Sequence, residues 1–113
     1  MLNEILTAAG VLHDPRGRFL RMPDQTHAVT FDNIERDGAD RVGAIPAGGL
    51  PGVYHHSGTI ELYEPKPDPE AEAAIEREFD ARGIDWEKQD RYWLQDVQRY
   101  QVIYETSYTT KNK

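Results

Sequence analysis

The side chains best suited to chemistry gather between positions 53 and 79, in the stretch VYHHSGTIELYEPKPDPEAEAAIEREF. Two consecutive histidines, His55 and His56, open this stretch, and acidic residues fill its second half. Histidines and carboxylates together can bind a metal ion or transfer protons. On a strand, however, consecutive side chains point to opposite faces, so His55 and His56 cannot both bind one ion without a bulge. The spacing of His13 and His27 does not require them to join either, so we expect no metal site and no cofactor.

Catalysis by paired carboxylates or by a nucleophile is the second chemistry to weigh. A carboxylate pair works when the two environments drive the pKa values apart. Glu61 and Glu64 fall on opposite faces of a strand, and the glutamates within residues 70–78 are expected on a solvated helix surface. No serine stands in a Gly-x-Ser-x-Gly turn. We expect no enzyme, and the alternative is a small hydrolase that uses His55 or His56 with Glu61.

Charge and composition narrow the classes of partner. The 113 residues include 13 Lys and Arg against 20 Asp and Glu, a net charge of −7, whereas binding to nucleic acid by counterion release needs a basic surface. Cysteine is absent, which removes disulfides and thiolates. No apolar run approaches the roughly 20 residues of a membrane span, and the N-terminus lacks the basic flank of a signal peptide. We therefore expect a protein made in the cytoplasm, without membrane contact or specific nucleic-acid binding.

Apolar spacing predicts two helices. Residues 2–9 carry apolar side chains at i, i+3, i+4 and i+7, and Gly10 can end this helix. A second helix is predicted after the prolines of EPKPDP, with Asp68 as its cap, Pro69 at its first position and Gly83 as its terminator. The narrow apolar stripe of this second helix consists of Ala71, Ala74, Ile75 and Phe79.

Alternating apolar and polar residues predict the strands. HAVTFDNIE (27–35), the segment around Ile60 and Leu62, and the tyrosine-rich YQVIYETSYT (100–109) all show a period of two. The spacing in residues 85–94 fits a helix or a strand, and we expect a strand that pairs with the last one. The predicted fold is α+β in the order α-β-β-α-β-β, a four-stranded and mainly antiparallel sheet with two helices packed on one face, in a single domain over residues 1–113.

A loop rich in glycine and proline separates the first two strands, at residues 37–52. It is longer than most connections in a compact domain, and it lacks the Gly-Lys-Ser/Thr ending of a phosphate-binding loop. We expect it to serve as a contact loop, together with apolar positions on the last strand. The predicted interface residues are Asp37, Arg41, Ile45, Leu50, Ile103 and Tyr108.

The order of these segments resembles the tail terminator, or tail completion, proteins of long-tailed bacteriophages and prophages. The likeness extends over about residues 26–111: a strand with ELY, a short break, an acidic helix ending near Gly-Ile, and a strand pair that closes with a tyrosine-rich strand and a lysine. It also favours a strand over residues 85–94. The loop at 37–52 is long for that family, which leaves its contacts open.

The resemblance implies a structural virion protein without catalysis. Such proteins form a ring, commonly of six subunits, that caps the tail tube and joins it to the neck proteins on the head side. DNA passes through the lumen without specific binding, and negative charge on a channel wall would repel its phosphates. The alternatives are a head-closure or neck adaptor protein of the same connector and a module that binds an extended peptide by adding it to the sheet edge.

Overall fold

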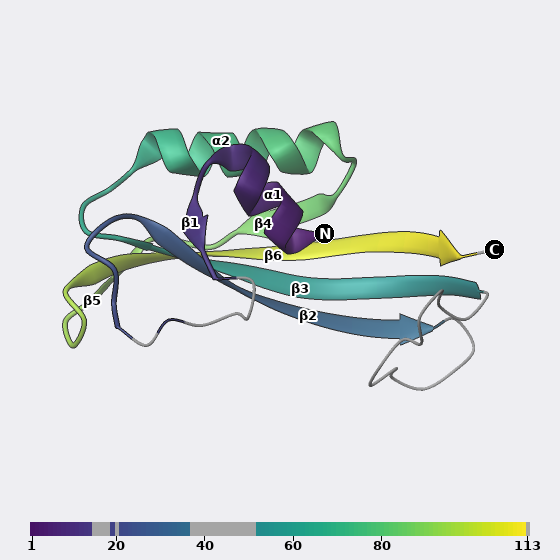
Figure 1. Cartoon of the computed structure of the whole chain (residues 1–113), viewed down its shortest axis with the longest axis horizontal. Helices are drawn as coiled ribbons and strands as arrows, with labels where there is room; N and C mark the ends of the chain where they lie inside the picture. The colour runs from purple at the N-terminus through teal and green to yellow at the C-terminus, as the bar shows by residue number, and fades with distance from the viewer. Residues whose placement is uncertain (15–18, 20, 37–51, 113) are drawn as a thin grey trace.

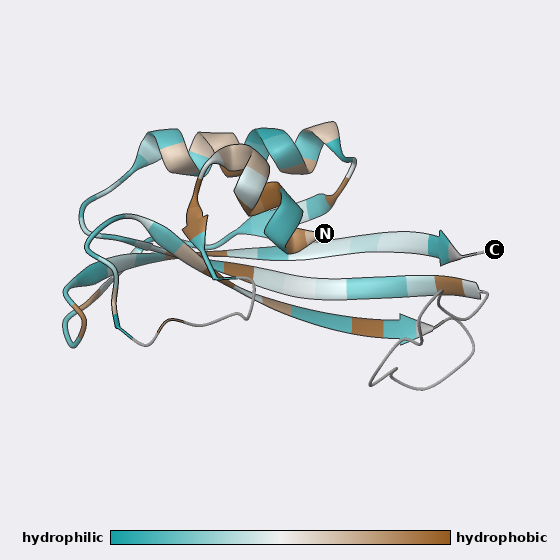
Figure 2. Ribbon diagram, viewed as in Figure 1, coloured by the Kyte–Doolittle hydropathy of each residue, from teal (hydrophilic) through white to brown (hydrophobic). Residues whose placement is uncertain are grey.

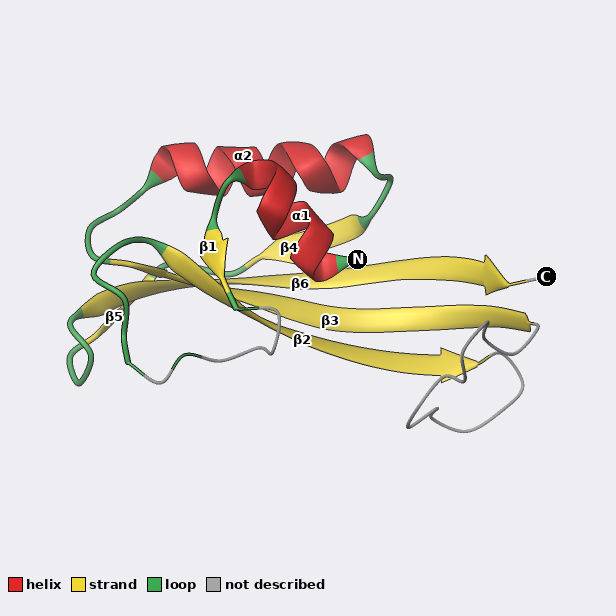
Figure 3. Cartoon of the chain, in the orientation of Figure 1, coloured by secondary structure: helices red, strands yellow, loops and turns green. Residues whose placement is uncertain are grey.

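Six strands form one mixed sheet within the described residues, and two helices lie on the same side of it (Figures 1 and 3). The computed structural model describes residues 1–14, 19, 21–36 and 52–112. Along the chain the elements are α1 (Leu2–Ala9), β1 (Leu12–His13), β2 (His27–Arg36), β3 (Gly52–Glu64), α2 (Pro69–Ala81), β4 (Asp85–Lys88), β5 (Tyr92–Leu94) and β6 (Arg99–Asn112).

The strand order confirms the predicted α+β class. It differs from the prediction in containing the short strand β1 and in dividing residues 85–94 into β4 and β5. The strands follow the order β1-β2-β3-β6-β4, and β5 also pairs with β6. The four predicted strands correspond to β2, β3, β6 and the β4–β5 segment, all of which pair antiparallel. The two-residue strand β1, which pairs parallel with the start of β2, was not predicted. Its few residues are too short for a periodic pattern, so nothing in the local sequence marks it.

The predicted single strand over residues 85–94 is wrong in its continuity. Lys88 pairs with Tyr104 and Tyr92 pairs with Gln101, so four steps along this segment oppose three steps along β6. One extra residue is therefore inserted at Gln89–Arg91, which is the definition of a β-bulge. The bulge interrupts the ladder, separates β4 from β5 and changes which face of the sheet the following side chains occupy.

The hydrophobic core lies between the helices and the even-numbered residues of the central strands. Leu2, Ile5 and Leu6 of α1 and Ile75 and Phe79 of α2 are buried. They pack against a set of strand residues that includes Ala28, Ile60, Leu62, Val102 and Tyr104. Figure 2 shows the apolar side of both helices facing the sheet. The alternations predicted for β3 and β6 thus place their apolar members toward the helices. The prediction for β2 is wrong in its face: Val29 and Phe31 lie on the side away from the helices, and the small Ala28 packs into the core instead.

Both helix boundaries follow the predicted signals. Gly10, at a φ of 74°, ends α1 in the left-handed region that glycine adopts without strain. The Asp68 carboxylate accepts a hydrogen bond from the Ala71 N–H at 3.2 Å, and Pro69 is the first residue of α2.

The expected solvated surface of α2 is wrong at Glu72. This side chain is buried, because positions 72, 75 and 79 stand at i, i+3 and i+7 and share one side of the helix with Ile75 and Phe79. A glutamate therefore occupies part of the stripe that faces the sheet.

The three longest strands extend beyond the helix layer. Figure 1 shows β2, β3 and β6 continuing past α1 and α2 to the end of the molecule that carries the C-terminus. One side of the sheet is thus covered by helices along only part of its length, and neither helix lies on the opposite side. This long ribbon sets the geometry of the exposed surface described next.

Candidate interaction surface

The predicted interface residues fall into two groups. Asp37, Arg41, Ile45 and Leu50 lie outside the described residues. Ile103 and Tyr108 are both half-buried, and their odd and even positions on β6 place them on opposite faces of the sheet.

Tyr108 lies on the helix side and is engaged within the chain. Its ring stacks on the ring of His56 with 4.3 Å between centroids, and its hydroxyl donates a hydrogen bond to Asp32 at 3.1 Å. Ile103 points to the side away from the helices. Of the two, only Ile103 belongs to the side of the sheet that the helices leave uncovered.

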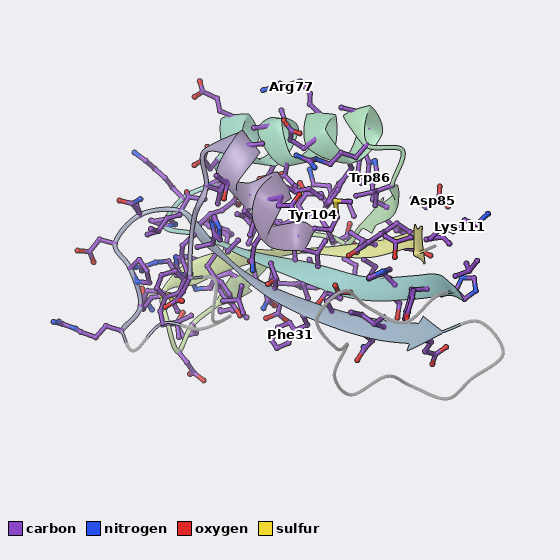
Figure 4. The ribbon with its side chains drawn as sticks, turned by 45° about the vertical axis from the view of Figure 1, so that its right-hand side comes forward. Phe31, Arg77, Asp85, Trp86, Tyr104 and Lys111 are labelled. Atoms are coloured by element: carbon purple, nitrogen blue, oxygen red, sulfur yellow. The ribbon has the colours of Figure 1, made fainter. Side chains whose placement is uncertain are left out.

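We call this uncovered side, over the middle of the long strands, the open face. Phe31 stands on it with 53% of its surface exposed, and Figure 4 shows its side chain directed away from the helices while Tyr104 points toward them. Small side chains at Ser57 and Thr59 leave a shallow hollow of about 230 Å³ beside Phe31. By strand register the open face comprises Phe31, Asn33, Ser57, Thr59, Glu61, Asp85, Glu87, Ile103, Glu105 and Ser107.

The charge of the open face is negative. Glu87 and Glu105 are directly opposite each other on β4 and β6, and both are exposed. Like charges at opposed strand positions destabilise a sheet. Among the described residues no cation forms an ion pair with either of these carboxylates. The open face therefore combines an exposed aromatic ring with unpaired negative charge, and we take it as the candidate contact surface.

The predicted hydrolytic pairs are wrong in their geometry. His56 faces the helix side and Glu61 faces the open side, so the two cannot act together. His55 shares the open side with Glu61, but six residues of strand place them about 20 Å apart.

A different polar group does form around His56. Its Nε2 is 2.9 Å from the Thr110 hydroxyl, and its Nδ1 is 3.6 Å from Asp32 Oδ2. Hydroxyl, imidazole and carboxylate follow the order of a nucleophile, its base and an orienting acid. The distance to Asp32 exceeds a hydrogen bond, however, and the imidazole is stacked on Tyr108. This arrangement ties β2, β3 and β6 together at the far end of the ribbon.

A groove of about 840 Å³ borders the start of α2, away from the open face. Proline residues and Val11 form much of its lining. Of the acidic side chains that line it, Asp68 is already engaged: one oxygen accepts the Ala71 N–H and the other accepts the Thr26 hydroxyl. The groove thus contains the helix cap.

The main feature that the sequence analysis missed is a buried charged cluster under α2. Glu64 is fully buried at the end of β3, and Arg91 of the bulge lies 3.3 Å from Glu64 and 2.6 Å from Glu72. Lys88 lies 2.7 Å from Glu72 and 2.9 Å from Glu76. The Tyr104 hydroxyl donates a hydrogen bond to Glu76 at 2.7 Å.

Burial and neighbouring charge perturb this cluster strongly. Burial, then the hydrogen bond and charge of Glu72, raise the pKa of Glu64 to about 7. Burial also acts to raise the pKa of Glu72, but hydrogen bonds involving Glu64, Lys88 and Arg91 outweigh it and lower that pKa to about 2. Burial, then the hydrogen bond to Glu76, raises the pKa of Tyr104 well above its usual range.

Two signals in the sequence pointed to this cluster. Glu64 has the same parity as Ile60 and Leu62 along β3, and Glu72 lies on the stripe of Ile75 and Phe79.

No helix within the described part of the chain is long and apolar enough to cross a membrane. Comparison of the chain with models of protein families, with curated proteins and with solved structures found no match.

Proposed function

We propose that the chain is a subunit of the homo-oligomeric ring that caps the tail tube of a long-tailed bacteriophage or prophage and joins it to the neck proteins on the head side. In this role the protein acts through its surfaces and catalyses nothing. Two lines support the proposal: the order and character of the segments over residues 26–111, and the open face of the sheet.

The exposed Phe31 on the open face is the observation that carries the proposal. A ring needs one surface that each subunit presents to the next, repeated around the axis. Exposed aromatic side chains mark contact surfaces, since burying the exposed half of a phenylalanine contributes about 1–1.5 kcal/mol. We infer that Phe31 on β2 and Ile103 on β6, which share the open face, are covered by the adjacent subunit, with the surrounding carboxylates at the rim.

The negative balance of the chain supports a ring that surrounds DNA. With a net charge of −7, the subunit would repel phosphates rather than hold them, so DNA could pass without sticking. The proposal gives the ring about six subunits, as the resemblance implies, and assigns it to the virion after assembly in the host cytoplasm.

The first test is the mass of the purified protein, measured by light scattering with and without isolated tail tubes. We expect a ring, or a monomer that becomes a ring upon addition of tubes. The variant Phe31→Asp should lose assembly while its circular dichroism stays that of the wild type. Met22→Asp is the matched control, because Met22 is 37% exposed but lies before β2, outside the sheet. A wild-type monomer that ignores tail tubes, or a Phe31→Asp ring, would contradict the proposal.

The neck adaptor alternative differs in its partner. The protein is added in one sample to DNA-filled heads without tails and in another to tails without heads. Measuring binding in each sample shows which end it binds. Binding to tail tubes alone supports a terminator, whereas binding to heads alone supports a head-closure protein.

The free edge of β2 favours a second candidate, a module that binds an extended peptide. β1 pairs with β2 only at His27 and Ala28, and beyond them the outer edge of β2 has no strand partner among the described residues. Such an edge can accept an added strand. A peptide of this kind would protect the outward amides of β2 from hydrogen exchange in a monomer, and a ring that forms without any peptide speaks against it.

A further inference from the structure

The buried cluster under α2 joins four separate parts of the chain. It consists of Glu64, Glu72, Glu76, Lys88, Arg91 and Tyr104. Glu64 ends β3, two glutamates come from α2, Tyr104 comes from β6, and the two cations come from β4 and the bulge that follows it. Among the described residues, the side chain of Arg91 links the bulge to the carboxylates, since it contacts Glu64 and Glu72 together.

A count of charges shows that the cluster needs one proton. Three carboxyl groups face two cations, and the tyrosine hydroxyl is a neutral donor. With one carboxyl protonated the cluster is neutral, and with none protonated it keeps one negative charge that is not compensated. An uncompensated charge in a buried site is costly.

Burial and the hydrogen bonds assign this proton to Glu64. Glu64 is 0% exposed, and its Oε2 has no donor among the described residues. Its Oε1 accepts from Arg91 at 3.3 Å, whereas Glu72 accepts from Arg91 and from Lys88 at shorter distances. Glu72 is therefore the better-stabilised carboxylate, and a proton carried by Glu64 and donated to Glu72 satisfies the remaining oxygen.

We propose that the cluster is a proton-dependent latch: one proton on Glu64, beside Glu72, holds the bulge against α2, and its loss at higher pH loosens the bulge and the strand β5 that follows it. The latch does not depend on the proposed ring. It acts on the bulge because Arg91 is the group whose two partners repel each other once the proton leaves. The segment beyond the bulge is weakly held, since β5 has only three residues, two of them exposed aromatics.

The direction of the effect follows from the groups that face Glu64. They are Glu72 from α2, Arg91 from the bulge, and Tyr100 and Tyr104 from β6. Glu76 and Lys88 act through Glu72, which Lys88 contacts at 2.7 Å. Burial and Glu72 raise the folded pKa of Glu64 to about 7 from an ordinary value of 4.5. Because the folded pKa is the higher one, the stabilisation is complete below pH 4.5 and is lost as the pH rises through 7.

The test combines a direct titration with a variant. Carbon-13 NMR of the Glu64 side-chain carboxyl in the wild-type protein should give a midpoint near 7. The equilibrium constant for unfolding in urea should rise on the order of 10- to 100-fold between pH 5 and pH 8 through this group. Glu64→Gln retains the shape and the donor of the protonated acid, so it should remove most of that rise. Glu70→Gln, on the exposed first turn of α2, is the matched control and should keep it.

Amide hydrogen exchange distinguishes local opening at the latch from a general loss of stability. After correction for intrinsic exchange, the amides of residues 87–94 should exchange faster at pH 8 than at pH 5, relative to those at the centre of β3. In Glu64→Gln this difference should disappear. A Glu64 midpoint at or below 5, or the same pH dependence of unfolding and exchange in wild type and Glu64→Gln, would overturn the latch.

Discussion

At the scale of single residues, position 58 shows how closely α1 lies on the sheet. A Cβ atom there would meet the Phe31 carbonyl oxygen at 2.5 Å and Leu2 Cδ1 at 3.0 Å. The first contact is with backbone of the neighbouring strand, which cannot move without breaking the β2–β3 ladder. Glycine at this position therefore allows α1 to pack against the sheet while the backbone below carries Phe31 on the open face.

We expect Gly58→Ala to lower the free energy of unfolding by about 1–3 kcal/mol, since an added methyl group in a close-packed site forces backbone shifts. Urea denaturation followed by tryptophan fluorescence measures the change. Ser57→Ala is the control, because Ser57 is exposed on the other face of the same strand and should change stability by less than about 0.5 kcal/mol. Equal stability of Gly58→Ala and Ser57→Ala would refute the close approach of α1.

At the scale of elements, the start of α2 depends on one side chain with two roles. Asp68 caps the helix through the Ala71 N–H and also accepts the Thr26 hydroxyl at 2.7 Å, which joins the helix to the segment that leads into β2. Its carboxylate further stands near the positive end of the helix dipole. This residue thus fixes both where α2 begins and how it sits beside β2.

We expect Asp68→Ala to lower the free energy of unfolding by about 1–2 kcal/mol, through loss of the cap and of the hydroxyl partner. Asp68→Asn should recover most of this stability, since an asparagine side chain also caps helices. Glu70→Ala, in the exposed first turn, serves as the comparison and should cost less. Thermal unfolding followed by circular dichroism measures the stability of all three variants. If Asp68→Ala were as stable as Glu70→Ala, the claim that Asp68 both caps α2 and holds Thr26 would be contradicted.

The elements also show what the sequence could reveal. Periods of two and near four located β3, β6 and both helices, because burial on one side produces the pattern locally. In β2 the period located the strand but assigned the wrong face, since Val29 and Phe31 lie on the uncovered side and Ala28 packs in the core. The bulge at Gln89–Arg91 produces no such pattern in the sequence, because it is defined only by how β4 and β5 pair with β6. The burial of Glu64 and Glu72 was not predicted for another reason. Glutamate is usually solvated, and this general preference outweighed the positions of both residues on apolar faces. The prediction that the Tyr108 side chain is exposed is wrong, because Tyr108 has the same parity as Tyr104 and therefore lies on the helix side of β6.

At the scale of the whole molecule, two charge systems behave differently. The cluster under α2 pairs the buried carboxylates of Glu64 and Glu72 with Arg91 and Lys88, which are 34% and 36% exposed, so salt screens these pairs less than fully exposed ones. The open face and the rest of the surface carry the negative excess of a chain with net charge −7, and there Glu87 and Glu105 oppose each other. Repulsion between exposed like charges weakens the folded state, and dissolved salt screens it.

We therefore expect added salt to stabilise the folded chain. Raising the sodium chloride concentration from about 10 mM to about 0.5 M shortens the screening length severalfold, so the free energy of unfolding should rise. Glu105→Lys should replace the repulsion with an attraction to Glu87, raise stability at low salt by a few tenths to about 1 kcal/mol, and reduce the dependence on salt. The control is Glu70→Lys, which makes the same charge change on the first turn of α2, away from the sheet. If salt lowered the stability of the wild type, or if both variants gained equally at low salt, the repulsion between Glu87 and Glu105 would not be what weakens the open face.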